Sequence, residues 1–318
     1  MAAPRAASHA DANDAQGELR TVMADRVLVV GASGQLGGAI ARKLLAAGVP
    51  VRAFARTREK LEPIGRLGAE VVAGDLANLP AVSAALHDVT QIVATANNNM
   101  GKGATSPRKL DVGAYQNLCA AARNARIQRL VYVSYRGVTP GVFVDIFRIK
   151  WYIEDVIRRS GVPHVILRPT ALMDVWIDQV IGPDLRKKGV ATIFGDGTRV
   201  QNYVAVEDVA EFAVRILARP EIVQDAVDLG GPSNLSLNEL VTLVERAWNV
   251  TAKRRHVPVA AMKLFPLVRP FSEVTSRLMS IGLYAATEAQ PFTDWQAAAQ
   301  RFAVQPMTVE DYLQRGAG

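Results

Sequence analysis

The sequence reads Val27-Leu-Val-Val-Gly31-Ala-Ser-Gly34-Gln-Leu-Gly37, so that an apolar run enters three glycines at GxxGxxG spacing. A helical stretch begins within the motif. The first glycine allows a tight turn, the second lets the backbone approach a pyrophosphate, and the third permits close packing of helix on strand. The helix N-terminus adds unpaired N–H groups and the positive end of its dipole. This stretch, with Ser33, Gln35 and Leu36, predicts a dinucleotide-binding turn.

From this motif onward, short apolar runs alternate with helical stretches, which is the pattern of βαβ units in a parallel sheet. The predicted strands are Val27–Val30, Val51–Ala55, Glu70–Ala73, Gln91–Thr95, Leu130–Ser134, His164–Arg168 and Ala226–Leu229. The predicted helices are Leu36–Ala47, Arg58–Leu67, Leu79–Leu86, Lys109–Asn124, Val144–Ser160 and Glu207–Ala218. Several strands are apolar almost throughout, as strands buried on both faces are. The predicted fold class is α/β, a Rossmann doubly wound parallel sheet.

The alternation fails in two places, and these predict a small C-terminal substrate lobe. Residues 172–202 hold a helix, a short strand at Ala191–Phe194 and a glycine turn, while the helix Leu237–Trp248 is followed by a helical tail with no evident strand. Ligands of open α/β sheets bind outside the carboxyl ends of the strands, so material inserted there covers the cleft. We expect a cofactor domain at 24–171, completed by 203–230, and a substrate or lid lobe made of 172–202 and 231–318.

Composition excludes several classes of protein. The chain has 318 residues, of which 49% are hydrophobic and 21% charged, values typical of a folded domain. Its net charge of +7 is spread mostly in ones and twos, which favours a phosphorylated small ligand over nucleic acid. The four histidines lack metal-ligand spacing, so we expect no metal. The sequence carries no signal for an oligomeric state.

The N-terminal residues and the cysteine count bear on location. Residues 1–23 are Ala-rich and polar without the apolar core of a secretory signal, and we expect a flexible tail, with Met1 or Met23 as the start. No apolar stretch is long enough to span a bilayer. The single cysteine, Cys119, allows no internal disulfide, as is typical of a reducing compartment. These features predict a cytoplasmic protein, with attachment to a membrane surface as the alternative.

The ends of the second, third and fourth strands distinguish between dinucleotides. NAD-binding proteins place Asp or Glu after the second strand for the ribose 2′-hydroxyl, whereas an Arg suits the 2′-phosphate of NADP. Arg56 stands there without an acid, so we expect NADP(H). Asp75 and Leu76 follow the third strand, where Asp75 suits the adenine amino group or a helix N-cap, a role that Asn78 also fits. Asn97 follows the fourth strand in an amide-rich loop suited to a ribose.

These motifs, together with Leu130-Val-Tyr-Val-Ser134, Tyr203-Val-Ala-Val-Glu207 and Leu229-Gly-Gly-Pro232, resemble those of the NmrA-like group of atypical short-chain dehydrogenases/reductases. The similarity covers about residues 26–248. The resemblance implies an NADP-binding Rossmann fold with a small substrate lobe, and it places the loop at Pro169 over the nicotinamide. The group includes quinone and isoflavone-type reductases, redox-sensing regulators, and accessory or assembly proteins of electron-transfer complexes.

The chain departs from the wider superfamily at the proton donor. Typical members carry Tyr-x-x-x-Lys on the helix after the fifth strand, where the Tyr gives a proton to the carbonyl. Lys150 matches the lysine, but Ile146 stands at the tyrosine position. Three alternatives stay open: Lys150 is the acid, directly or through a water; Tyr135 at the strand end is the donor; or Lys150 only holds the ribose. Ser134 matches the superfamily's substrate-binding serine.

Two functions are compatible with this pattern. The main interpretation is an NADPH-dependent reductase of a small apolar carbonyl or quinone that lacks the usual catalytic Tyr. The alternative is a non-catalytic NADP(H)-binding redox sensor, or an accessory or assembly protein of an electron-transfer complex. Residues 257–283 are largely apolar with Lys263 and Arg269 spaced among them. They are expected to form a lid over the cleft or, alternatively, a surface for a redox partner or a membrane interface.

Overall fold

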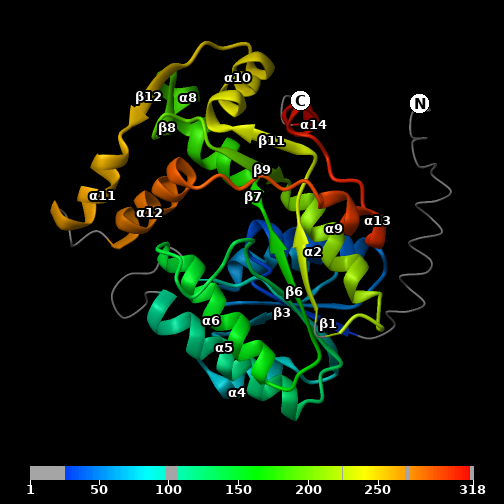
Figure 1. Cartoon of the computed structure of the whole chain (residues 1–318). Helices are drawn as coiled ribbons and strands as arrows, with labels where there is room; N and C mark the ends of the chain where they lie inside the picture. Colours follow the sequence, from blue (N-terminus) through cyan, green and yellow to red (C-terminus); the bar gives the residue numbers. More distant parts are fainter. Residues whose placement is uncertain (1–25, 98–106, 224, 269–272, 316–318) are drawn as a thin grey trace.

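The computed structural model describes residues 26–97, 107–223, 225–268 and 273–315. Its centre is a seven-stranded, wholly parallel sheet in the order β10-β6-β5-β4-β1-β2-β3 (Figure 1). The strands are β1 (Arg26–Val30), β2 (Val51–Ala55), β3 (Glu70–Ala73), β4 (Val89–Ala94), β5 (Arg129–Val133), β6 (His164–Pro169) and β10 (Asp225–Leu229). Strand order reverses between β1 and β4, as in a doubly wound Rossmann sheet. The predicted fold class is confirmed.

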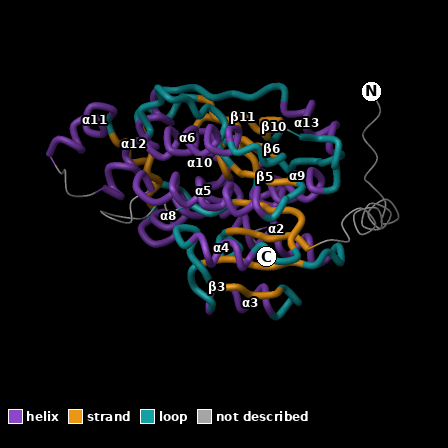
Figure 2. Tube along the Cα trace, turned by 90° about the horizontal axis from the view of Figure 1, so that it is seen from below, coloured by secondary structure: helices purple, strands orange, loops and turns teal. Residues whose placement is uncertain are grey.

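Helices cover both faces of this sheet, and the strands lie between two helical layers in the view of Figure 2. One layer contains α2 (Gln35–Ala46), α3 (Glu62–Gly65), α9 (Val206–Leu217) and α13 (Trp295–Phe302), and the other α4 (Leu79–Ala85), α5 (Pro107–Asn124) and α6 (Asp145–Arg159). Val27 and Val29 pack into the first core, and Leu28 and Val30 into the second. Burial on both faces explains why β1 is apolar throughout.

A smaller lobe lies over the carboxyl ends of the sheet (Figure 1). One small sheet contains β7 (Ala171–Leu172), β9 (Val200–Val204) and β11 (Ser233–Ser236), and another β8 (Val190–Phe194) and β12 (Lys253–Val257). The helices are α7 (Met173–Val175), the π-helical turn η3 (Trp176–Ile181), α8 (Gly182–Lys188), α10 (Leu237–Trp248), α11 (Val259–Val268), α12 (Glu273–Thr287) and α14 (Val309–Arg315). Residues from η3, α10 and α14 share one apolar core.

The expectation of a tail without a strand after α10 is wrong, because β12 lies there. Four of its five residues are exposed, and it is held by parallel backbone pairing with β8. An exposed, charged strand has no apolar alternation for a sequence pattern to detect. The helix expected at Arg58–Leu67 is also shorter, being a 3₁₀ turn, η1 (Glu59–Leu61), followed by α3. Beyond α3, Gly68 has a φ of +101°, which no α-helix accommodates.

Some sequence expectations fall on residues outside the described part of the chain. These are the flexible tail with Met1 and Met23, the loop after Asn97 at residues 98–106, and Arg269. Within the described residues, no helix has both the length and the apolar character to cross a bilayer. The described residues also hold no group of three or more His, Cys, Asp or Glu side chains arranged to bind a metal ion.

Candidate functional site

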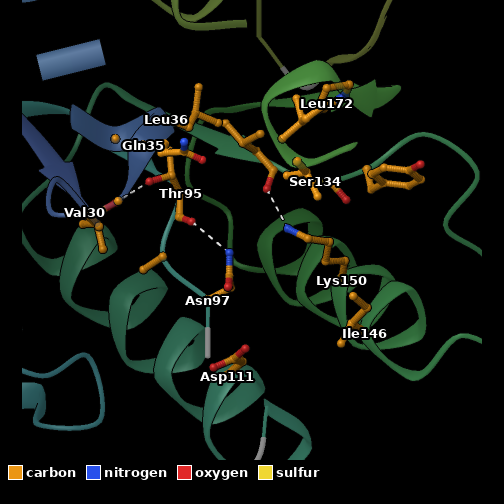
Figure 3. A pocket seen from close by; sticks show the side chains of 18 of the residues that line it. Val30, Gln35, Leu36, Thr95, Asn97, Asp111, Ser134, Ile146, Lys150 and Leu172 are labelled. Carbon is orange, nitrogen blue, oxygen red and sulfur yellow. Dashed lines mark hydrogen bonds between the residues drawn. The ribbon is translucent and has the colours of Figure 1, made fainter. Parts of the chain in front are cut away.

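A cavity of about 490 Å³ lies at the carboxyl ends of the central strands, beneath the small lobe. All the candidate residues line it: Gly31, Ser33, Gly34, Gln35, Leu36, Gly37, Arg56, Asp75, Leu76, Asn97, Ser134, Tyr135, Lys150 and Pro169. Figure 3 shows Gln35 and Leu36 on one side of this space and Lys150 and Ile146 on the other, with Leu172 of the small lobe nearby. The cavity therefore occupies the switch point where open α/β sheets bind their ligands.

The glycine turn between β1 and α2 leaves no room for side chains. Gly31 has a φ of +85°, and a Cβ added to Gly37 would lie 2.2 Å from the Gly31 carbonyl oxygen. No side chain caps α2, and its first turn holds no acidic residue. Its first N–H groups therefore have no capping side chain and no acidic neighbour, which suits a pyrophosphate. A dinucleotide fits this turn.

The polar residues at the ends of β2 and β3 suit the adenosine half of a dinucleotide. Arg56 is exposed at the mouth of the cavity, whereas Arg52 of β2 is buried and donates to the carbonyls of Ala85 and His87. Asp75 lines the cavity and accepts a hydrogen bond from Ala77 N at 2.9 Å. Asn78 is the N-cap of α4, so Asp75 is not needed for that role. Arg56 is thus a cationic side chain at this end of the cavity.

Replacing Arg56 with alanine is expected to weaken NADPH binding by about 10- to 100-fold and to leave NADH binding within about twofold, because only NADPH carries the phosphate that this guanidinium suits. Fluorescence titration of both nucleotides measures the two changes. Arg58→Ala is the matched control, since Arg58 is exposed two residues further on and donates to the Val71 carbonyl. An equal loss for NADPH and NADH would contradict the assignment.

Lys150 lies on α6 and its amine reaches the end of β5, where Nζ donates to the Val133 carbonyl at 3.1 Å (Figure 3). The side chain is partly exposed, toward the cavity that it lines. The surrounding protein still displaces most of its water, and this burial lowers the pKa of the amine to about 8, against opposing effects of Asp111 and Glu154. One turn earlier, the buried Ile146 offers no proton.

Aromatic side chains form the wall beside Lys150. Tyr135 stacks on Phe147 with ring centroids 4.3 Å apart, and Phe147 meets Tyr284 edge-on at 5.3 Å. Burial raises the pKa of the Tyr135 hydroxyl well above its ordinary value, which makes it a weaker acid. The buried Ser134 oxygen makes no hydrogen bond of ordinary geometry with a described residue, although it is close enough to Glu154 to help lower the pKa of that carboxyl.

An ion pair between α6 and β6 lies next to this end of the cavity. The Glu154 side chain is fully buried one turn after Lys150, and its Oε1 accepts from Arg168 Nε at 3.0 Å. Burial raises the pKa of Glu154, but hydrogen bonds from Arg168 and Arg158 outweigh it and hold the pKa below the ordinary value. Arg168 therefore works as a structural partner, and it fixes the end of β6 where the next residue, Pro169, lines the cavity.

Sequence reasoning missed several residues that line the site. Thr95 Oγ1 donates to the Val30 carbonyl at 3.1 Å beside the glycine turn (Figure 3). Asp111 of α5 brings a buried carboxylate to the cavity. On α12, Ile281 lies inside the segment 257–283 expected to form a lid or a partner surface, Tyr284 lies just beyond it, and both form part of the cavity wall. Asp111 stands in no recognisable motif. The residues of α12 belong to an apolar segment whose pattern fits a core as well as a lid.

Residues 31–220 match the model of a protein family described as NAD(P)H-binding. The chain belongs to that family. It is an NmrA-like atypical short-chain dehydrogenase/reductase, as the motifs predict. Among curated relatives, it is 26% identical over 296 residues to the photosystem II assembly factor Ycf39 of Synechocystis sp., covering 91% of this chain and 90% of the relative.

Two further likenesses are to reductases. The chain is 22% identical over 312 residues to the phenylcoumaran benzylic ether reductase PT1 of Pinus taeda, covering 91% of this chain and 97% of the relative. Its fold matches that of the NADPH-dependent quinone oxidoreductase QOR2 of Escherichia coli with a TM-score of 0.75 and 17% identity, covering 92% of this chain and 100% of the other. The proteins that this chain resembles therefore include ones named as reductases and one named as an assembly factor.

Proposed function

We propose that this chain is an NADP(H)-binding accessory protein that assists the assembly of an electron-transfer complex, and that its cavity holds the dinucleotide without reducing a carbonyl or quinone. The observation that carries the proposal is Ile146. It occupies the place, one helical turn before Lys150, where reductases of the wider superfamily carry their acid. Tyr135 lines the cavity just after the end of β5, but burial makes its hydroxyl a weaker acid.

The binding half of the proposal rests on the glycine turn and Arg56. Bound NADPH can supply a hydride, but carbonyl reduction also needs a proton. Gly31, Gly34 and Gly37 would hold the pyrophosphate, Arg56 the 2′-phosphate, and Lys150 a ribose hydroxyl while it donates to Val133. Four curated relatives named as photosystem II assembly factors support the accessory role, and the similarity covers at least 73% of each of them.

The second candidate is an NADPH-dependent reductase of a small apolar carbonyl or quinone. The observation that favours it is the pKa of about 8 for Lys150, which lies close enough to neutral pH for the ammonium to give up a proton. The stacked Tyr135 and Phe147 would suit a planar substrate. In this case the rate would fall as pH rises through about 8, because the amine loses the proton that it must donate.

An assay of NADPH oxidation against quinones and small aldehydes tests the choice. We expect no turnover above that of the buffer, in wild type and in Lys150→Met alike. Oxidation that depends on the added acceptor and disappears in Lys150→Met would make the chain a reductase and overturn the accessory role. Nucleotide titration of both proteins is the control that checks whether each one has NADPH bound under the assay conditions.

The affinity for NADPH is expected to fall by about 3- to 10-fold between pH 7 and pH 9. Lys150 is protonated below about pH 8, where its ammonium favours an anionic nucleotide, and it becomes neutral above that pH. Lys150→Met is expected to bind more weakly at pH 7 and to show little change across this range. Titrations at several pH values measure both trends. If the NADPH affinity of Lys150→Met changed with pH as steeply as that of wild type, Lys150 would not be part of the binding site.

A further inference from the structure

Helices α11 and α12 form a hairpin that stands out from the body of the protein. In both views α11 lies at the outer edge of the molecule, with α12 between it and α6 (Figures 1 and 2). Among the described elements, the extensive packing of α11 is against α12. The inner side of α12 carries Ile281 and Tyr284 into the cavity wall. The hairpin therefore has an inner helix, α12, that packs against the rest of the protein, and an outer helix, α11, with much of its surface uncovered.

The uncovered surface of the hairpin is apolar. On α11, Ala260, Ala261 and Leu264 are exposed, and these positions share one helical face. Leu264 is 55% exposed and Leu278 of α12 is 49% exposed. Single exposed leucines are ordinary on protein surfaces, but an outer helix this rich in apolar residues and lacking a covering layer indicates a binding surface.

The charged residues of β12 and α11 are all basic, whereas α12 begins with Glu273, which pairs with Arg277. From Arg246 to Ser272 the sequence contains no Asp or Glu but has six basic residues: Arg246, Lys253, Arg254, Arg255, Lys263 and Arg269. Lys263 is exposed on α11 among the apolar residues, and Lys253 is exposed on β12 just before the hairpin. Arg254 and Arg255 pair with Glu245 and Asp184, yet both remain on the exposed strand. A partner for this region is therefore expected to be anionic.

An anionic lipid surface combines the two properties that this region matches. Apolar helices that lie at a bilayer interface bury aliphatic residues among the acyl chains and keep Lys at the headgroups, where its long side chain reaches the phosphates. The cores of protein–protein interfaces are instead depleted in Lys, whereas Lys263 is exposed on α11 beside the face that Ala260, Ala261 and Leu264 share. Small aliphatic residues flanked by Lys, with no acidic residue from Arg246 to Ser272, fit the bilayer better.

We propose that the α11–α12 hairpin, with the basic strand β12, docks this protein on an anionic membrane surface. The docking is peripheral, since no described helix is suited to crossing a bilayer. The apolar face of α11 inserts at the depth of the headgroups, and Lys253 and Lys263 bind lipid phosphates. This surface is separate from the glycine turn and from Arg56, so docking and nucleotide binding are measured independently.

Co-sedimentation of the full chain with vesicles tests this proposal. Binding is expected to be at least about 10-fold stronger to vesicles of phosphatidylcholine with 30% phosphatidylglycerol than to phosphatidylcholine alone, and to weaken as salt is raised. Leu264→Glu is expected to reduce binding by about 10-fold or more, because it removes an apolar side chain that the bilayer buries and adds a negative charge. Lys263→Glu is expected to reduce it by a smaller factor.

Leu67→Glu provides the matched control. Leu67 is also 55% exposed, but it lies between α3 and β3, away from the hairpin, and its variant is expected to bind vesicles as wild type does. NADPH titration and circular dichroism check that each variant is folded. Equal binding to both vesicle types, no binding to either, or an equal loss in Leu67→Glu would overturn the proposal. Self-association that Leu264→Glu abolishes, without vesicle binding, would assign the face to a second copy and overturn it too.

Discussion

Gly37→Ala is expected to weaken NADPH binding by at least about 100-fold. The added Cβ would lie 2.2 Å from the Gly31 oxygen and 2.9 Å from Thr95 Oγ1. The first of these contacts is with backbone, so α2 must move away from β1 and take its N–H groups out of position. A shift of about 1 Å in a preorganised site costs roughly 100-fold. Calorimetric titration with NADPH measures the loss.

Gly113→Ala is the control for this substitution. Gly113 lies within α5, and a Cβ added there meets nothing within 4 Å. Alanine is favoured over glycine inside a helix by about 0.5–1 kcal/mol, so this variant is expected to be slightly more stable and to bind NADPH normally. If Gly37→Ala bound NADPH as wild type does, the glycine turn would not be the pyrophosphate site.

Glu154→Ala is expected to destabilise the protein by about 3–5 kcal/mol, because it leaves the cationic partners of a buried carboxylate without compensation. The Glu154 side chain is 0% exposed and contacts Arg158 and Arg168. Among the described residues, the neighbouring Asp155 pairs only with Arg159. This pair lies at the surface, since the Arg159 side chain is 80% exposed. Asp155→Ala is therefore expected to cost less than about 1 kcal/mol. Urea unfolding of the two variants gives the comparison.

The same ion pair gives the stability a predictable pH dependence. The pKa of Glu154 is lower in the folded protein than its ordinary value, so the folded state binds fewer protons in the interval between the two. The stabilisation is fully present above the unfolded pKa and is lost as pH falls through the folded one. Wild type should therefore lose more stability on acidification than Glu154→Ala does. Similar acid sensitivity of the two proteins would show that another group controls it.

The central sheet can be predicted from the sequence because its strands are buried on both faces and separated by helices. The run from Val27 to Val30 has no polar residue, and the glycines that follow restrict the turn to one geometry. The small lobe lacks such signals. Its β12 is exposed and charged, and β9 buries Asn202, whose amide donates to the Gly231 carbonyl at 2.8 Å. Strands stabilised by backbone pairing and polar networks leave little trace in hydrophobic periodicity.

The residues of the candidate site also divide into those that the sequence predicts and those that it does not. Arg56, just after β2, and Lys150, on the helix that follows β5, can be predicted because the order of elements fixes where each strand ends and each helix begins. Tyr284 and Ile281 reach the cavity from a helix far along the chain, and their position depends on how the small lobe packs. The aromatic stack of Tyr135 on Phe147 is likewise a product of tertiary packing, since neither residue belongs to a motif.

The most direct test is a calorimetric titration of wild type with NADPH, NADP and NADH, followed by incubation of the NADPH complex with quinones and small aldehydes. Tight binding of the two phosphorylated nucleotides, weaker binding of NADH and no consumption of NADPH are the predicted results. Rapid NADPH oxidation would contradict the accessory role and make Lys150 the first residue to study as an acid. Absence of nucleotide binding would contradict the assignment of the cavity itself.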